Sequence, residues 1–277
     1  MKYLILGSSG QIGSHLVSYI RSQGDEVVEY DIVRDEKEDL RIHNNKTLLD
    51  FHISQSDFVF FLAFDVGGAR YLEKYQNSYQ FIDNNIKIMS NTFDLLKKHS
   101  KPFIFTSSQM SDMGHSTYGL CKALGERFTN CLEGLNVRLW NVYGNENDLE
   151  KSHVITDFIN KAKKNSNIDM LTNGQEERQF LYADDCSECL HILSKEYDSL
   201  DKNEKYHITS FEWTSIEEVA KIVCSKFEGT TYTRSEKEDM VHQGWKTEPD
   251  KHILKYWKPK TSLTQGISQL VDNSNVK

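Results

Sequence analysis

The sequence predicts an α/β protein: a doubly wound parallel sheet with helices on both faces and a smaller α/β lobe at the C-terminal side. Three observations lead to this expectation. Strand-like and helix-like segments alternate through the first half of the 277 residues, several strands are apolar on both faces, and a glycine-rich turn follows the first strand. That strand covers residues 3–6, and the helix after the turn runs to about Gln23.

The other elements of the first half follow in order. The predicted strands are residues 26–31, 58–64, 103–107 and 137–140. The predicted helices are a short one around Leu48, a long one from about Gln76 to His99 and one that begins near Ser116. The run from Phe58 to Ala63 is apolar at every position, so it cannot alternate between core and water. We therefore expect it at the centre of the sheet.

The glycine-rich turn is the sequence GSSGQIG, and the helix after it carries Leu16, Val17 and Ile20 on one face. Glycine allows the backbone to approach a pyrophosphate, while the helix N-terminus offers unpaired N–H groups and the positive end of the dipole. The turn therefore predicts a dinucleotide cradle. Its residues are Gly7, Ser9, Gly10, Gln11, Ile12 and Gly13.

Asp31 ends the second strand, 18 positions after Gly13. A carboxylate there can accept hydrogen bonds from both ribose hydroxyls of an adenosine, and it would repel a 2′-phosphate. The alternative is an ordinary strand–turn–helix unit followed by an acidic loop. We predict a Rossmann-type fold that binds NAD; Arg34 keeps NADP open, because an arginine just after this strand can accept that phosphate.

The chain is longer than a usual domain of about 100–150 residues. We expect residues 1–140 to form the NAD-binding Rossmann domain, with about 178–190 and 205–211 returning to it. The pattern loosens after Gly144, and residues 141–277 are expected to form mainly a substrate-binding lobe. Open α/β sheets bind ligands at the carboxyl ends of their strands, so this lobe should lie there.

Composition narrows the class of protein. A formal net charge of −8 argues against nucleic acid as a partner. No apolar stretch approaches the roughly 18 residues that span a bilayer, and the N-terminus enters a strand without a charged leader, so we expect a cytoplasmic protein with no membrane partner. The five cysteines do not resemble a disulfide framework. Cys186 and Cys189 lack further zinc ligands nearby, and we expect no metal but two small residues on the buried side of a helix.

Tyr118 and Lys122 lie four positions apart, so on a helix both project from one face. A nearby ammonium stabilises a phenolate and would lower the pKa of the tyrosine toward neutrality, which makes the phenol a general acid or base. The pair follows Ser107 and Ser108, which end a predicted strand at the same edge of the sheet as the glycine turn. This arrangement predicts an oxidoreductase site.

With these motifs the chain resembles the extended short-chain dehydrogenase/reductase family, specifically its NAD-dependent nucleotide-sugar epimerases and dehydratases. The resemblance covers nearly the whole chain. Besides GSSGQIG it rests on Asp39-Leu40, the strand from Asp57 to Ala63, Asp83-Asn84-Asn85, FTSS at 105–108, YGLCK at 118–122, RLWNVYG at 138–144, RQFLYADD at 178–185 and WKPK at 257–260. It implies a homodimer that pairs through two long helices.

The resemblance also implies roles for single residues. Tyr118 would be the acid/base at a sugar hydroxyl, Lys122 would hold the nicotinamide ribose, and Ser108, or alternatively Ser107, would hydrogen-bond that hydroxyl. The remaining cofactor contacts would be Asp39 and Leu40 at the adenine, with Leu62, Ala63 and Asn85. Asn141 and Arg178 would contact the pyrophosphate of the substrate, which a guanidinium binds bidentately.

One branch is more similar than the others: the enzymes of GDP-sugars, which include GDP-fucose synthase. Residues 62–68, LAFDVGG, resemble its LAxxxGG loop and imply that Gly67 and Gly68 contact the substrate. Residues 152–155 resemble a segment that keeps an acid/base histidine, which would be His153; alternatively, His153 only flanks the helix that starts at Val154. The predicted partner is therefore a nucleotide-sugar, with GDP preferred.

The departures from the family limit the reaction. Gln109 and Met110 stand where a 4,6-dehydratase needs an Asp-Glu pair, and no cysteine lies between Ser107 and Tyr118 to serve as the second base of a 3,5-epimerase. We expect oxidation of the C4 hydroxyl of the sugar by hydride transfer to NAD, in a 4-epimerase or a 4-dehydrogenase. The alternatives are a 4-keto-sugar reductase and a non-catalytic NAD-binding protein.

Overall fold

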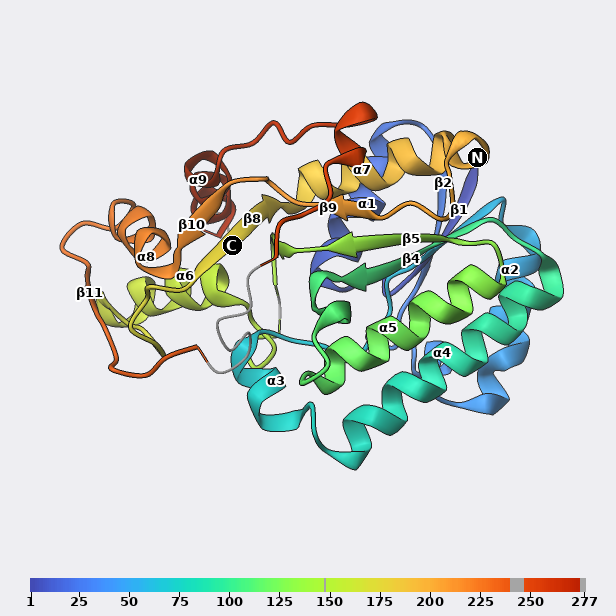
Figure 1. Ribbon diagram of the computed structural model, residues 1–277, viewed down its shortest axis with the longest axis horizontal. Coiled ribbons are helices and arrows are strands. Elements are labelled where there is room, and N and C mark those ends of the chain that lie inside the picture. Colours follow the sequence, from blue (N-terminus) through green and yellow to red (C-terminus); the bar gives the residue numbers. More distant parts are fainter. Residues whose placement is uncertain (147, 240–246, 275–277) are drawn as a thin grey trace.

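The computed structural model describes residues 1–146, 148–239 and 247–274. Its larger part is a six-stranded parallel sheet with helices on both sides (Figure 1), as the sequence predicts. In spatial order the strands are β2 (Glu26–Tyr30), β1 (Lys2–Leu6), β3 (Phe58–Phe61), β4 (Phe103–Ser108), β5 (Leu135–Leu139) and β9 (Tyr206–Ile208). The order reverses beside β1, and such a point is where open sheets bind ligands.

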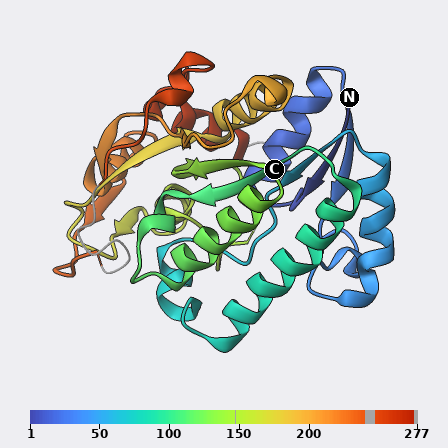
Figure 2. The same cartoon turned by 45° about the vertical axis from the view of Figure 1, so that its right-hand side comes forward.

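Two layers of helix cover the sheet, one on each face (Figure 2). One layer is α1 (Gln11–Ser22) with α7 (Ala183–Lys195); the other is α2 (Lys46–Gln55), α4 (Tyr79–His99) and α5 (Thr117–Cys131). Along β1, Tyr3 and Ile5 pack toward the first layer and Leu4 and Leu6 toward the second. All four residues of β3 are buried, so the prediction of a central strand is confirmed.

The ends of some elements differ from the sequence-based expectation. The helix predicted from Gln76 starts as α4 at Tyr79, because the Ser78 hydroxyl accepts a hydrogen bond of 3.2 Å from the Phe81 N–H and caps the helix. A separate helix, α3 (Ala69–Tyr75), precedes it and was not predicted. β3 ends at Phe61 rather than Phe64, and the chain then turns toward the small lobe.

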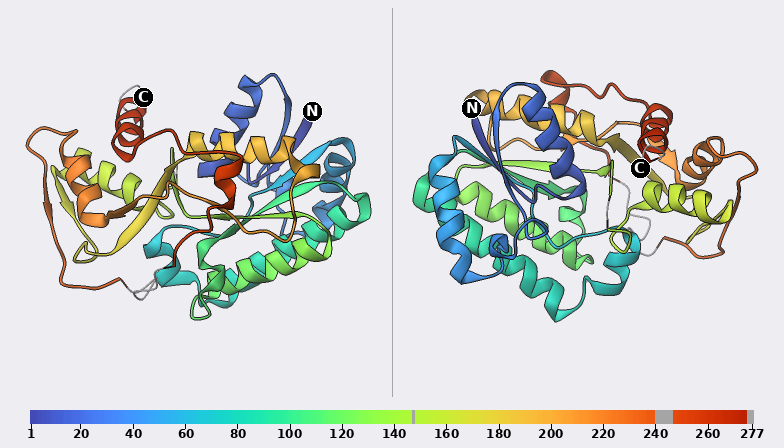
Figure 3. Two further views of the ribbon diagram at one scale, coloured as in Figure 1. Left: turned by 45° about the horizontal axis from the view of Figure 1, so that its top comes forward. Right: turned by 180° about the vertical axis from the view of Figure 1, so that it is seen from behind.

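The small lobe lies at the carboxyl ends of the main strands (Figure 3). Its three-stranded sheet is β10 (Trp213–Ser215), β8 (Glu177–Tyr182) and β6 (Asn141–Tyr143); its two-stranded sheet is β11 (Thr231–Thr233) and β7 (Asn167–Asp169). Its helices are α6 (Val154–Asn165), α8 (Ile216–Cys224) and α9 (Leu263–Ser274). The strand that carries Arg178 thus pairs within the small sheet, whereas the following α7 and β9 join the main one.

Cys186 and Cys189 are fully buried in α7, where the sequence placed them. Within the described ranges no three His, Cys, Asp or Glu side chains are grouped as metal ligands. None of the helices that the structure describes combines the length and the apolar composition needed to cross a bilayer.

Candidate active site

A cavity of about 1210 Å³ opens between the carboxyl edge of the main sheet and the small lobe. Apart from Asn85, every site residue predicted from the sequence lines this one cavity, although these residues come from segments as far apart as Gly7 and Arg178. The fold therefore brings the predicted cofactor, catalytic and substrate residues to a single place.

The glycine turn closes against the next strand of the sheet. Gly7 has a φ of 87°, and a Cβ on it would lie 2.7 Å from the Ala63 nitrogen. A Cβ on Gly13 would lie 2.0 Å from the Gly7 oxygen. Only glycine fits at these two positions. The tight turn that they form leaves the N-terminus of α1 facing the cavity, which is the arrangement that binds a pyrophosphate.

Asp31 is tied to this turn. Its carboxylate accepts hydrogen bonds of 2.9 Å from the backbone N–H groups of Ser9 and Val33. Arg34, which kept NADP open, does not line the cavity; its guanidinium pairs with Glu29 at 2.9 Å and Glu38 at 3.8 Å. A carboxylate thus lies at the end of β2 beside the glycine turn, and the Arg34 guanidinium is engaged away from the cavity.

Asn85 lies outside the cavity. It is fully buried in α4, its Oδ1 accepts a hydrogen bond of 2.8 Å from the Asp65 N–H, and its Nδ2 donates to the Asp65 and Phe81 carbonyls. Its side chain therefore fixes the loop after β3 and does not line the cavity. The expectation of a cofactor contact by Asn85 does not fit this placement, because all its polar atoms are used inside the fold.

Asp39 and Leu40 line the cavity as expected. Arg41 chelates the Asp39 carboxylate, with both nitrogen–oxygen distances at 2.8 Å, and this holds the pKa of Asp39 below its usual range although burial alone would raise it. The acidic group expected near the adenine is thus pre-oriented by an arginine that the sequence analysis did not single out.

The structure separates the two serine candidates at the end of β4. The Ser107 hydroxyl donates to Glu126 at 2.6 Å, and Glu126 is in turn held by Arg138. The Ser108 hydroxyl instead shares a hydrogen bond with Tyr118. Ser108 is therefore the serine that contacts the phenol.

Tyr118 and Lys122 both face the cavity from α5, but their electrostatics differ from the expectation. Burial raises the pKa of Tyr118 to about 12, against the smaller opposite effect of the Ser108 hydrogen bond, and burial lowers the pKa of Lys122 to about 7. The Lys122 ammonium donates to the Thr106 carbonyl at 2.7 Å and lies 3.7 Å from the centre of the Phe64 ring. The prediction that Lys122 lowers the pKa of Tyr118 is wrong for this structure, because burial dominates the pKa of both groups.

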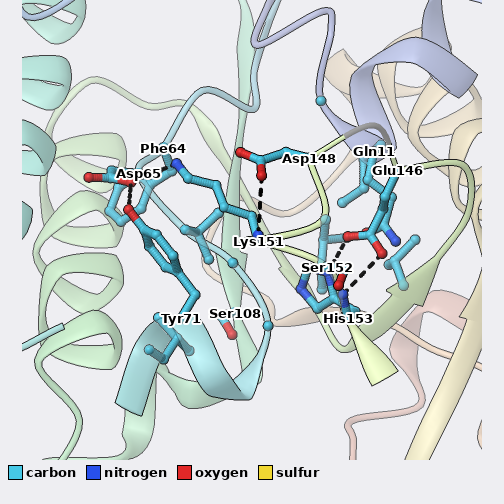
Figure 4. A pocket seen from close by; sticks show the side chains of 18 of the residues that line it. Gln11, Phe64, Asp65, Tyr71, Ser108, Glu146, Asp148, Lys151, Ser152 and His153 are labelled. Atoms are coloured by element: carbon cyan, nitrogen blue, oxygen red, sulfur yellow. Dashed lines mark hydrogen bonds and ion pairs between the residues drawn. The ribbon is translucent and has the colours of Figure 1, made fainter. Parts of the chain in front are cut away.

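Asp65 forms a second polar centre on the cavity wall. Its carboxylate accepts hydrogen bonds from the Tyr71 hydroxyl at 2.7 Å, the Asn84 amide at 2.8 Å and the Lys151 ammonium at 3.0 Å. Burial would raise the pKa of Asp65, but these bonds hold it below the usual range. Asp65 follows β3 and Lys151 precedes α6, so this pair links the main sheet to the small lobe (Figure 4).

His153 lies across the cavity from Asp65 and next to Glu146 (Figure 4). Its Nδ1 is 2.6 Å from Glu146 Oε1, and its backbone N–H donates to Glu146 Oε2 at 3.0 Å. Gly67 and Gly68 line the same cavity, and the Gly68 N–H donates to the Lys151 carbonyl at 2.9 Å. His153 does flank the start of α6, yet its ring makes no cap hydrogen bond to that helix.

Asn141 and Arg178 lie on the small-lobe side. Asn141 Nδ2 is buried and has no hydrogen-bond partner among the described residues, so it is a donor that a ligand oxygen would satisfy. Arg178 pairs with Asp239 and donates to the Glu177 carbonyl at 2.7 Å. A phosphate at this place would have to share the guanidinium with Asp239.

Comparison with known families agrees with this geometry. The sequence model described as "NAD dependent epimerase/dehydratase family" matches residues 3–209. The chain belongs to this family. NAD is accordingly its cofactor, and the glycine turn and Asp31 line the cavity together.

Two curated proteins similar to this chain are UDP-glucuronic acid decarboxylases. UDP-glucuronic acid decarboxylase 1 of Arabidopsis thaliana is 24% identical, with 70% of this chain and 52% of that protein covered. The chain spans about half the length of the curated relatives it matches.

Solved structures show the same fold across the full chain. UDP-glucose 4-epimerase of Thermotoga maritima, solved with UDP-glucose, has a TM-score of 0.81 at 19% identity and full coverage of both chains. A GDP-6-OMe-4-keto-L-xylo-heptose reductase from C. jejuni has a TM-score of 0.83 at 18% identity, with 99% of this chain and 97% of the other covered. Enzymes named for UDP-sugars and for GDP-sugars thus share this fold.

Several residues of the cavity were not predicted: Phe64, Asp65, Tyr71, Glu146 and Lys151. Only two of them left a signal in the sequence. Asp65 and Glu146 each follow a strand, β3 and β6, and polar residues just past the carboxyl ends of strands line such clefts. Tyr71 lies on the unpredicted α3, and Lys151 meets Asp65 only through the tertiary fold.

Proposed function

We propose that this protein is an NAD-dependent oxidoreductase that oxidises the C4 hydroxyl of a nucleotide-linked sugar. The observation that carries the proposal is the group formed by Ser108, Tyr118 and Lys122 on the wall of the cavity that also holds the glycine turn. A hydroxyl pair beside a lysine at the nicotinamide end of a dinucleotide cradle suits the removal of a proton from an alcohol.

Three residues of the chain have separate roles in the proposed reaction. Tyr118 accepts the proton of the sugar hydroxyl, and Ser108 donates a hydrogen bond to the oxygen as its charge develops. Lys122 holds the ribose, and its charged form stabilises the phenolate of Tyr118. Bound NAD supplies the acceptor for the hydride that leaves C4, so that the alcohol becomes a ketone.

The substrate is proposed to be a GDP-sugar, bound mainly by residues 141–277. Asn141 offers its unpartnered amide and Arg178 its guanidinium to the pyrophosphate. Glu176, on the same cavity wall, offers a carboxylate to the amino and ring N–H donors of guanine, which uracil does not present as a pair. Calorimetry with GDP and UDP tests this preference, and tighter binding of UDP would contradict it.

Return of the hydride to the other face of the ketone would make the enzyme a 4-epimerase; release of the ketone would make it a 4-dehydrogenase, and the reverse reaction a 4-keto-sugar reductase. Incubation with NAD and a series of GDP- and UDP-sugars, followed by NMR of the products, distinguishes these outcomes. The proposal predicts that the wild type transfers hydride with at least one of these sugar nucleotides and that Y118F transfers hydride with none of them.

His153 is proposed as a second acid/base, because its ring lines the cavity and is 38% exposed, whereas its carboxylate partner is buried. The competing reading is a protein that binds NAD without turnover. It would be supported if wild-type protein and Y118F bound NAD equally and neither transferred hydride to or from any sugar nucleotide.

The homodimer remains a proposal that the surface supports. Six apolar side chains are exposed on the two adjacent helices α4 and α5, at helical spacing: Tyr79, Ile82, Ile86, Leu120, Leu124 and Phe128. Pairing these faces across a two-fold axis would bury them in a four-helix interface. Light scattering should give a dimer for the wild type and a monomer for L124E.

A further inference from the structure

Both carboxylate oxygens of Glu146 contact His153. Oε1 lies 2.6 Å from the imidazole Nδ1, and Oε2 accepts the backbone N–H of the same residue at 3.0 Å. Thr156, one turn into α6, adds a further hydrogen bond to the carboxylate. The acid is 7% exposed, so the ring is held by a rigid acceptor and not by a side chain that samples the solvent.

The protonation state of Glu146 follows from these bonds. Burial alone would raise its pKa, but the hydrogen bonds from His153 and Thr156 hold the pKa below the usual range. An ionised carboxylate only accepts hydrogen bonds, so the hydrogen of the neutral imidazole must be on Nδ1. Nε2 is then left with its lone pair.

Another histidine–carboxylate pair in the protein shows what is particular to this one. His15 has both ring nitrogens engaged, Nδ1 with Asp184 at 2.5 Å and Nε2 with the Asn145 N–H at 3.1 Å, and here the ring is buried and the carboxylate exposed. That pair joins α1 to α7, and the Asn145 contact ties His15 to the segment after β6. At His153 the order is reversed: the carboxylate is buried and the ring faces the cavity.

We propose that Glu146 is a positioning residue that fixes His153 as the tautomer with Nε2 ready to accept a proton from the sugar-nucleotide. The inference rests on the proposed function, because it needs a substrate in the cavity. When Nε2 takes the proton, the imidazolium lies beside a carboxylate that stabilises it, and the proton returns to substrate or solvent from the same atom.

The test compares E146Q with E150Q. Glu150 lies on the same segment, but it bonds Tyr75 at the surface and does not line the cavity, so E150Q is the matched control. The inference predicts that E146Q loses roughly 10²-fold in kcat, with KM and NAD affinity unchanged. E150Q keeps wild-type values. H153Q should lose as much as E146Q, and the double variant no more than either.

The pH dependence adds a readout that a purely structural role would not move. One limb of the plot of kcat against pH should disappear in H153Q. The same limb should move to another pH in E146Q and stay at the wild-type pH in E150Q. An unchanged profile, a loss confined to NAD affinity, or independent losses in the double variant would overturn the inference. If E146Q does not fold, E146D keeps the charge but withdraws it from Nδ1, and the same loss in kcat is expected.

A measurement without turnover separates this inference from the proposed function. Nitrogen NMR of the imidazoles should place the hydrogen of His153 on Nδ1 in the wild type and in E150Q, but not in E146A, which lacks the acceptor. The other tautomer in the wild type would overturn the role of Glu146 even in an active enzyme. Failure of every sugar nucleotide to transfer hydride would instead contradict the proposed function.

Discussion

The ammonium nitrogen of Lys122 lies 3.7 Å from the centre of the Phe64 ring, and the same ring meets the Tyr118 ring edge-on at 5.9 Å. Phe64 thus covers part of Tyr118 and Lys122 on α5. The energy of a cation over an aromatic face offsets only part of the lost hydration, so the lysine gives up its proton easily. The pKa of Lys122 thus lies near neutrality, whereas the phenol of Tyr118 stays neutral.

Binding of NAD should therefore take up a proton. The pKa of Lys122 is lowered to about 7 by burial, and ribose hydroxyls that accept hydrogen bonds from the ammonium would raise it again. Calorimetry at about pH 8 in buffers of different ionisation enthalpy should show uptake of close to one proton, and at about pH 6 almost none. Equal uptake at both pH values would show that another group titrates.

Replacement of Lys122 should stabilise the protein while abolishing its activity. The pKa of Lys122 is about 7 in the folded chain and 10.5 in the reference state. Between these values the unfolded chain holds a proton that the folded chain does not, so the free energy of unfolding rises with pH.

K122M removes this pH dependence. It should be more stable than the wild type by a few kcal/mol at and below about pH 7, on the order of 1.4 kcal/mol per pKa unit, and the gain should fade toward about pH 10.5. Urea unfolding across this range measures the difference. A gain that does not depend on pH would point to packing alone.

The two neighbouring serines should differ in their effect on catalysis. S108A removes the hydroxyl bonded to Tyr118 and should lower kcat by about 10²-fold with little change in NAD affinity. S107A removes a hydroxyl that serves Glu126, so it should affect stability by about 1 kcal/mol and leave kcat near the wild-type value. Steady-state kinetics of the two purified variants check this; the reverse order of effects would assign the role to Ser107.

Asp31 and Arg34 provide a matched pair for cofactor choice. D31N should weaken NAD binding by roughly 10- to 100-fold, because a hydrogen bond to a charged acceptor contributes about 1.5–3 kcal/mol. The same variant should have a smaller preference for NAD over NADP than the wild type. R34A should change neither affinity, since its guanidinium serves Glu29 and Glu38. Fluorescence titration with both cofactors measures the ratio; a loss of NADP binding in R34A would contradict the assignment.

Much of the fold could be predicted because its signals are local. The apolar run of β3, the alternation of elements and the glycine turn depend on neighbouring residues, and each has a physical cause that a sequence displays. The two features that the sequence analysis missed also have local signals, but these signals are weaker. The helix α3 is only seven residues long, and the start of α4 depends on a single Ser78 cap.

The site was predictable where a strand end or a helix face fixes a residue, as for Asp31, Ser108 and Tyr118. It was not predictable where two segments meet only in space. Glu146 precedes His153 by seven positions, the described residues between them form no helix, and Asp65 meets Lys151 only through the tertiary fold. The protonation states of Tyr118 and Lys122 could not be predicted from the sequence either, because the burial of this pair depends in part on Phe64, which follows β3.

The central claim is that hydride moves from C4 of a bound sugar to NAD under the control of Tyr118. The most direct test is a single turnover with a sugar nucleotide that carries deuterium only at C4 of the sugar, with mass spectrometry of the recovered dinucleotide. The account predicts reduced cofactor with the label on the nicotinamide ring for the wild type and unlabelled, oxidised NAD for Y118F. Label that stays on the sugar while product forms, or reduced cofactor without label, would contradict it.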